Sequence, residues 1–469
     1  MHITSLYGDY SIGSFGEEAK AWIDFLADCG FSWWQVLPLC PIDECNSPYQ
    51  SHSAFGGNPY LVDLPTLCRE GLLTEEEISH HRQQTPYSCE YVRLYHNRLE
   101  LLRTAAGRAE NRDEIVKWTE ERPYLQQFCQ FMSLKEVNEN RPWQSWTVSE
   151  GKEETLFLWQ FIQFHFFRQW QALRAYAGER GIQILGDIPI YVALDSADVW
   201  SRPEQFWLDE KGMPSAVAGV PPDYFAPEGQ HWGNPLYRWD VMRQDGYRWW
   251  CDRMKHMLTM FDGVRLDHFR GFESYWGIPA SAPSAKNGSW HKGPGMELIQ
   301  RFQKIADGSL IVAEDLGEIT PQVEQLVEQS GFPGMRVIQF GFCGEGDTPH
   351  LPHHYGHNTV CYTGTHDNNT LLGFLWELEE EKKKRMLDYC NYHDPDWERG
   401  YDSIVRTLFA SHSDLVILPV QDLLKYGSDT RLNIPGKADG NWQYRITAEQ
   451  LQSIDRGYYR HLNELYGRM

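Results

Sequence analysis

The 469-residue chain lacks several patterns that mark common protein classes. It has ten cysteines but no C-x-x-C pair, so no disulfide, zinc or redox framework is visible. No run of about 18 apolar residues occurs, and we therefore expect no membrane-spanning helix. The opening "MHITSLYGDYSIG" has no basic segment followed by an apolar one, which argues against a signal peptide. With its scattered thiols, the chain is predicted to be cytoplasmic.

Positive charge is also scarce. The chain has 43 Lys and Arg against 65 Asp and Glu, giving a net charge of -22. Such a field repels phosphates, which argues against nucleic acid and anionic membranes as partners but not against a neutral ligand. Aromatic residues are plentiful, with 19 Trp, 24 Tyr and 22 Phe. Most aromatic side chains pack in cores, but some can offer flat faces to sugar rings.

Short apolar runs alternate with helix-like segments such as 16–30 and 295–308. This alternation predicts βα units and an α/β fold. The runs that we interpret as buried parallel strands are 31–39, 181–192, 261–269, 309–317, 334–342, 358–367 and 414–424. They favour a (β/α)8 TIM barrel whose eighth strand is not located. A doubly wound open sheet is the alternative, but no G-x-G-x-x-G follows an early strand.

We predict one catalytic barrel over residues 1–469, with insertions between its strands. The gap between the first two strands is too long for one βα unit, and about 70–160 reads as a helical insertion. Two segments rich in Pro, Gly and aromatics, 195–245 and 272–295, are predicted to be irregular active-site loops. Part of the first, 221–230, is expected to cover the cleft.

Four of the predicted strands finish on an acid: Asp187, Asp267, Glu314 and Asp367. In a barrel, these strand ends surround one mouth. A turn, a helix cap or a plain ion pair could explain any one of these acids. Clustered carboxylates repel each other, so several at one mouth favour a functional site over a stabilising role.

The strand 261–269 shows how such a site could be built. Side chains alternate along a strand, so Val264 and Leu266 should face the helices while Arg265 and Asp267 face the barrel axis. A neighbouring guanidinium should lower the pKa of Asp267 and keep it ionised, as a nucleophile requires.

Two carboxyl groups on adjacent strands suit glycoside cleavage, in which one protonates the leaving oxygen and the other lies across the anomeric carbon. Asp267 and Glu314 follow consecutive strands, and His366 could bond a sugar hydroxyl. The histidines of "HLPHHYGH" (350–357) match no zinc spacing and precede a strand, so we expect solvated side chains there and no metal.

With these residues in place, the chain resembles the amylomaltases, the 4-α-glucanotransferases that form a branch of the α-amylase superfamily. The resemblance covers nearly the whole chain and rests on six blocks in order: "NSPYQSHSAFGGNPYLVDL" (46–64), "GDIPIYVALDSADVW" (186–200), "GQHWGNPLYRW" (229–239), "FDGVRLDHFRGF" (261–272), "VAEDLG" (312–317) and "YTGTHDNNT" (362–370).

The resemblance implies a retaining enzyme that moves α-1,4-glucan segments between maltooligosaccharides through a covalent glucosyl-enzyme intermediate. It implies that Asp267 is the nucleophile, Glu314 the acid/base and Asp367 the carboxylate that stabilises the transition state. The substrate-binding residues that it implies are Ser47, Tyr49, Asp187, Trp232, Arg265, His366 and Asn441.

The chain also departs from the family pattern. Its opening is less regular, and Asn369 stands where the family often has an acid. No Asn-His follows "DIPIYV", so we expect no structural calcium, and no cofactor is implied. His268 and Arg270 are given no step in the reaction.

Two other functions stay open. The first is an α-1,4-glucan hydrolase on the same scaffold, which would share all three carboxylates. The second is a non-catalytic glucan-binding protein, which should have lost an acid. In each case we expect a monomer or a weak homodimer.

Overall fold

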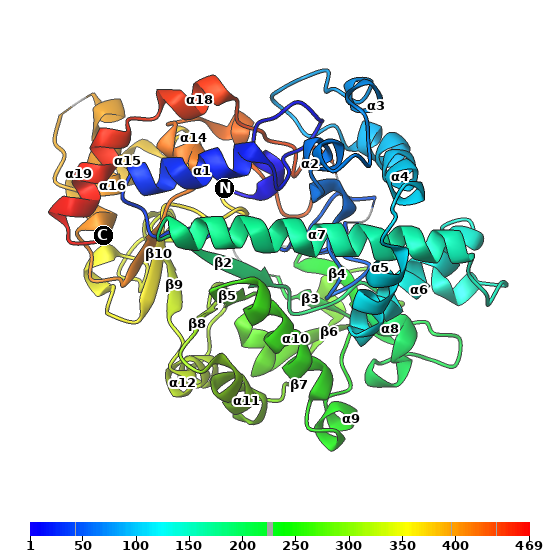
Figure 1. Ribbon diagram of the computed structural model, residues 1–469. Helices are drawn as coiled ribbons and strands as arrows, with labels where there is room; N and C mark the ends of the chain where they lie inside the picture. The colour runs from blue at the N-terminus through cyan, green and yellow to red at the C-terminus, as the bar shows by residue number, and fades with distance from the viewer. Residues whose placement is uncertain (43, 223–227, 395, 438) are drawn as a thin grey trace.

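A computed structural model describes residues 1–42, 44–222, 228–394, 396–437 and 439–469 of the chain. Its centre is a parallel sheet in the order β1-β2-β5-β8-β9-β10-β11 (Figure 1). The strands are β1 (Trp33–Gln35), β2 (Gln183–Ile188), β5 (Gly263–Leu266), β8 (Leu310–Ala313), β9 (Gly334–Val337), β10 (Thr359–Tyr362) and β11 (Leu415–Ile417). Each lies within one of the segments predicted from sequence, and the barrel architecture is confirmed.

Helices surround this sheet on its outer side. The main ones are α1 (Glu17–Asp28), α2 (Leu64–Arg69), α7 (Glu153–Glu179), α10 (Arg248–Met260), α11 (Met296–Ala306), α12 (Pro321–Ser330), α14 (Leu371–Glu377), α15 (Glu380–Tyr389), α16 (Tyr401–Phe409), α18 (Ala448–Ser453) and α19 (Arg456–Leu465). Val264 and Leu266 belong to the large core shared with the helices, as predicted. Leu185, Val312 and Val337 pack in a separate cluster inside the barrel.

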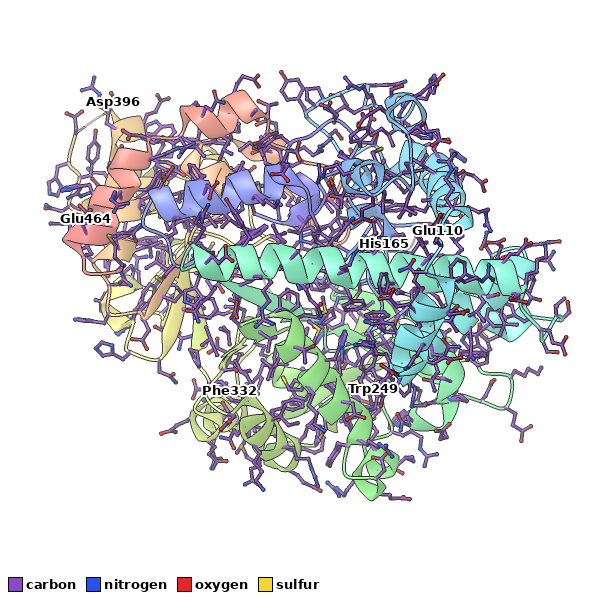
Figure 2. The ribbon with its side chains drawn as sticks, viewed as in Figure 1. Glu110, His165, Trp249, Phe332, Asp396 and Glu464 are labelled. Atoms are coloured by element: carbon purple, nitrogen blue, oxygen red, sulfur yellow. The ribbon has the colours of Figure 1, made fainter. Side chains whose placement is uncertain are left out.

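The helical insertion also forms as expected. It comprises α3 (Glu75–Ser79), α4 (Tyr91–Gly107), α5 (Arg112–Glu120) and α6 (Pro123–Val137). The chain returns to the barrel along the long helix α7, which lies beside α4, α5 and α6 toward one end and below α1 toward the other (Figure 1). Figure 2 places Trp249 on α10, where its indole N–H donates to Asp198 Oδ1 at 3.0 Å.

The two insertions predicted to be irregular instead share an antiparallel sheet in the order β4-β3-β6-β7. Its strands are β3 (Ala216–Val220), β4 (Gln230–Pro235), β6 (Ser274–Pro279) and β7 (Ser289–Lys292). The expectation of irregular loops was wrong because pairing between two distant segments stabilises strands whose own composition, rich in Gly and Pro, disfavours them. Residues 223–227 of the segment expected to cover the cleft lie outside the described residues.

The parallel sheet does not close among the described strands. β1 pairs with β2 alone and β11 with β10 alone, so no hydrogen bonds join β1 to β11. All three residues of β11 are half-buried, whereas all four of its neighbour β10 are buried. The eighth strand that the sequence left unlocated is therefore not among the described elements. None of the helices in the described ranges is long and apolar enough to cross a membrane.

Candidate active site

Three neighbouring strands place acids at one end of the barrel in a fixed register. Asp187 of β2 lies opposite Arg265 of β5, and Leu266 lies opposite Ala313 of β8. Asp267 and Glu314 directly follow these last two residues, so they leave adjacent strands at the same level. Their backbones extend the ladder: Asp267 N–H donates to Ile188 at 3.0 Å, and Glu314 N–H donates to Leu266 at 3.1 Å. The sheet thus holds both carboxyl groups on one rigid wall.

Arg265 joins two of the acids. Its Nη1 donates to both carboxylate oxygens of Asp187, at 2.9 and 2.8 Å. Its Nη2 lies 3.0 Å from Asp267 Oδ1, which confirms the contact expected from strand alternation. Tyr49 completes the network by donating its hydroxyl to Asp187 Oδ2 at 2.6 Å. Because Asp187 and Arg265 are buried, this pair fixes the guanidinium beside Asp267.

The prediction that the pKa of Asp267 is low was wrong. Burial raises it to about 7, and Arg265 opposes this rise without overcoming it, while Asp187 and Asp367 add to it. The guanidinium is shared with Asp187, so the cost of desolvating the Asp267 carboxylate prevails. Burial raises the pKa of Glu314 further, to about 8, with Arg265 again opposing and Asp267 adding to the rise. The direct contact with Arg265, at 3.0 Å, favours ionisation of Asp267.

The backbone after β5 orients Glu314. His268 has a left-handed conformation, with φ 48°, and its N–H donates to Glu314 Oε2 at 2.7 Å. Leu316 N–H donates to Glu314 Oε1 at 3.1 Å. His268, unexplained by sequence, thus acts through its backbone to position the carboxyl group.

The third acid, Asp367, follows β10 and is held by a distant loop. Asn433 Nδ2 donates to Asp367 Oδ1 at 2.6 Å, and Arg431 donates to the Asp367 carbonyl at 2.6 Å. Asn433 N–H also donates to the carbonyl of His366 at 3.1 Å. His366 Nε2 lies 3.4 Å from Asp367 Oδ2. Sequence reasoning missed Asn433 and Arg431, because they lie in a loop without a motif, 66 residues beyond Asp367 in the case of Asn433.

Aromatic faces lie beside these acids. The Tyr49 ring stacks on His366 with centroids 5.1 Å apart, and Trp442 lies 5.9 Å from each of them. Trp232 packs edge-on against His268 at 5.0 Å. Ser47 Oγ accepts the Tyr49 N–H at 3.2 Å and so shapes the turn that carries Tyr49. Flat apolar rings beside carboxylates suit a ligand with apolar faces and hydroxyl edges.

Two other residues singled out in the sequence support the surrounding structure. Asn441 accepts from Ile434 N–H at 2.9 Å and donates to the Lys437 carbonyl at 2.9 Å, so its amide braces its own loop. Its role in binding substrate stays a prediction. Arg270 donates to the Glu318 carbonyl and lies 3.9 Å over the ring of Trp290 in β7. It therefore ties the antiparallel sheet to the barrel.

The histidine-rich segment lies apart from this arrangement. His353 Nδ1 contacts the Tyr389 hydroxyl at 2.9 Å, and His357 Nδ1 contacts Asp414 at 3.0 Å. His354 Nε2 lies 2.5 Å from Asp347 Oδ1. One ligand atom each from Asp347, His353 and His354 lies within 4.8 Å of the others, but all three residues are exposed. The expectation of no metal there stays a prediction.

This combination of a parallel barrel with acids and aromatic rings at its mouth defines a carbohydrate-active enzyme. The model of the 4-alpha-glucanotransferase family matches residues 1–451. The chain is 41% identical to the 4-alpha-glucanotransferase of Synechocystis sp., covering 100% of this chain and 97% of that protein. It is 42% identical to that of Thermus thermophilus, covering 96% and 94%. The chain therefore belongs to the 4-alpha-glucanotransferase family and is an enzyme of that class.

A solved structure gives the same result. The amylomaltase from Streptococcus agalactiae in complex with acarbose superposes with a TM-score of 0.95 at 37% identity, covering 100% of this chain and 98% of that one. The family expected from the sequence blocks is confirmed.

Proposed function

We propose that the chain, a single catalytic unit over 1–469, transfers α-1,4-glucan segments between maltooligosaccharides by double displacement. Asp267 is the nucleophile, Glu314 the general acid/base and Asp367 the carboxylate that stabilises the transition state. The observation that carries the proposal is the wall formed by β2, β5 and β8. There, Arg265 bridges Asp187 and Asp267 while Glu314 leaves the next strand at the same level.

In the first step, Asp267 attacks the anomeric carbon while Glu314 gives its proton to the glycosidic oxygen. The glycosidic bond breaks, and the reducing-end fragment leaves with that proton. In the second step, an acceptor hydroxyl attacks the glucosyl ester, Glu314 takes up the hydroxyl proton, and the bond to Asp267 breaks. Two inversions give net retention of configuration.

The charges around the two carboxyl groups support these roles. Burial raises the pKa of both Asp267 and Glu314, but Asp267 lies 3.0 Å from the Arg265 guanidinium, which favours its ionised form. The charge on Asp267 in turn favours the protonated form of Glu314, so the resulting form has Asp267 charged and Glu314 protonated. That is the form in which a nucleophile and a general acid can act together.

We further propose that Tyr49 and His366 offer a stacked platform at the cleavage point, with Ser47 fixing the turn below Tyr49. Trp232 would border the acceptor side, and Asn441 would shape a loop near the site. Arg265 and Asp187 would act on the sugar mainly through Asp267. Aromatic binding of the acceptor favours transfer over hydrolysis, because a bound hydroxyl reaches the intermediate before water does.

Incubation with pure maltotriose tests the proposal. A transferase yields glucose together with a ladder of oligosaccharides longer than maltotriose. Glucose and maltose without longer products would identify a hydrolase instead. Binding without any turnover would identify a glucan-binding protein.

We also propose a cytoplasmic location and a monomeric or weakly dimeric state. Buried thiols such as Cys29 and Cys129 fit a reducing compartment. Analytical ultracentrifugation of the purified chain measures its oligomeric state directly.

A further inference from the structure

The loop that carries Asp367 is held at both of its ends by the same two buried side chains. This loop, residues 363–371, joins β10 to the first residue of α14. β10 pairs with β9 on one side and with β11 on the other. Gln339 follows β9, and Asp422 follows β11 in α17 (Val420–Leu423). The two neighbours of β10 thus each supply one side chain to the same loop.

Asp422 accepts a hydrogen bond from each end of the loop. Thr363 Oγ1 donates to Asp422 Oδ2 at 2.5 Å, and Leu371 N–H donates to Asp422 Oδ1 at 2.8 Å. Asp422 is 1% exposed. Burial raises the pKa of Asp422 to about 6, and the two hydrogen bonds oppose this rise by favouring the charged form. One carboxyl group therefore fixes the distance between the start and the end of the loop.

Gln339 makes a second bridge, with donors in place of acceptors. Its Nε2 donates to the carbonyl of Thr363 at 2.9 Å and to the carbonyl of Asn369 at 2.9 Å. A primary amide has two N–H donors, so both of those on Gln339 are used on the loop. A Cβ added at Gly364 would lie 2.7 Å from Gln339 Nε2, so the glycine allows the amide to approach the backbone.

Between these ends, bonds within the loop set the place of Asp367. Thr365 N–H and Thr365 Oγ1 both donate to Asn368 Oδ1 at 2.9 Å. Asp367 N–H donates to Thr365 Oγ1 at 3.3 Å. These bonds form a tight turn around Asp367, and this turn is joined to the barrel through the two ends of the loop. A displacement of either end should therefore move Asp367.

From this double bridge we infer that Gln339 and Asp422 are positioning residues for the reaction, which hold the two ends of the loop and so fix the carboxyl group of Asp367 at the barrel mouth. The inference rests on the transition-state role proposed for Asp367. Both residues act through the loop and not on the sugar. A misplacement of about 1 Å can lower a rate by up to about 10²-fold. Loosening the loop should therefore lower kcat more than it raises KM.

Substitutions at Thr363 test this inference with little change in shape. Thr363→Val removes the hydroxyl that bonds Asp422, whereas Thr363→Ser keeps it. With maltotriose as substrate, we expect kcat for total consumption to fall about tenfold in Thr363→Val with little change in KM. In Thr363→Ser, kcat should stay within about twofold of the parent. Hydrogen exchange at the amides of 364–370 should be at least about tenfold faster in Thr363→Val than in Thr363→Ser.

Thr359→Val is the matched control at the opposite end of β10. The buried hydroxyl of Thr359 donates to the Gly356 carbonyl at 2.7 Å and lies 2.8 Å from Ser413 Oγ. Its loss should lower Tm but leave kcat and exchange in 364–370 unchanged. An equal fall in kcat in Thr359→Val and Thr363→Val would overturn the inference, because the loss would then follow from general destabilisation.

Gln339→Met removes both donors of the second bridge at similar volume and should repeat the two effects of Thr363→Val. Unchanged exchange in 364–370 in both variants would overturn the inference, and so would an increase in KM without a fall in kcat. Because total consumption of maltotriose is measured, hydrolysis in place of transfer does not change this test. Parent-like turnover by Asp367→Asn would refute the role proposed for Asp367, whereas faster exchange in Thr363→Val would still show that the bridge holds the loop.

Discussion

The two halves of the barrel wall differ in how completely their strands are hydrogen-bonded to neighbouring strands. The strands β2, β5 and β8 are each paired on both sides, and charged side chains lie at or just beyond their carboxyl ends. At β1 and β11, one side of each strand is unpaired, and the exposed edge is apolar. The first half holds buried charges on strands that are paired along both edges, whereas each strand of the second is paired along one edge alone. Substitutions in the two halves should therefore change different properties.

The largest effect should follow from Asp267→Asn in the closed half. An amide cannot form the glycosyl ester, so we expect the rate of maltotriose disproportionation to fall by on the order of 10⁴-fold or more. Oligosaccharide binding, measured by calorimetry, should survive. Asp262→Asn is the matched control, since Asp262 lies before the start of β5, where it binds Arg174 and the Ile184 N–H. Turnover by Asp267→Asn within tenfold of the parent would refute the nucleophile assignment.

Asn433→Ala tests whether a loop can position an acid as firmly as a strand does. Asn433 donates to Asp367 Oδ1 and also to the backbone of His366, so only the side-chain bond is lost. We expect kcat to fall roughly 10- to 100-fold with little change in KM, because the proposed role of Asp367 is to stabilise the transition state. Asn433→Asp should lower kcat further, because it places two carboxylates in contact. An increase in KM alone would show that Asn433 serves ground-state binding.

The pH dependence tests the electrostatics of the closed half. The proposed mechanism requires Asp267 ionised and Glu314 protonated, so kcat/KM should fall below about pH 7 and above about pH 8. Each limb should approach a tenfold change per pH unit. In Glu314→Gln, assayed with a donor whose leaving group needs no proton, the alkaline limb should disappear and the acid limb should stay. Persistence of the alkaline limb would assign it to another group.

The titration of Asp267 should also change the stability of the folded chain with pH. The pKa of Asp267 is higher in the folded chain than the usual value of about 4 in an unfolded one, so the folded state binds the extra proton. Stability from this group is present below about pH 4 and is lost as pH rises to about 7. Asp267→Asn removes this loss, so its Tm should exceed that of the parent by a few degrees at pH 8 and by little at pH 4. An equal difference at both pH values would contradict the raised pKa.

The sequence predicted the seven strands because each is a short apolar run that is buried on both faces, which is a local property. It predicted the acids at the strand ends for the same reason, since Asp267 and Glu314 directly follow such runs. It could not predict that β3 and β6 pair, because that pairing depends on two distant segments and not on the composition of either. Asn433 was missed on similar grounds, since only the folded chain brings its loop to Asp367.

The prediction of a low pKa for Asp267 failed for a different reason. The contact with Arg265 follows from strand alternation, but the sharing of Arg265 with Asp187 depends on the register between β2 and β5. The depth of burial also depends on the insertions that surround the mouth. The pKa shift at such a site is a difference between large opposing contributions. Arg265 was therefore correctly predicted as the neighbour of Asp267, but the direction of the shift was not.

The smallest effect should come from a matched pair of substitutions, one in each half. Val312 of β8 is fully buried inside the barrel, whereas Val416 is half-buried in β11, which pairs with β10 alone. Val312→Ala should lower the free energy of unfolding by about 1–2 kcal/mol, and Val416→Ala by less than half of that, because its neighbours leave space on one side. Urea unfolding measures both. Equal costs for the two substitutions would mean that Val416, although β11 is paired on one side alone, is packed as tightly as Val312.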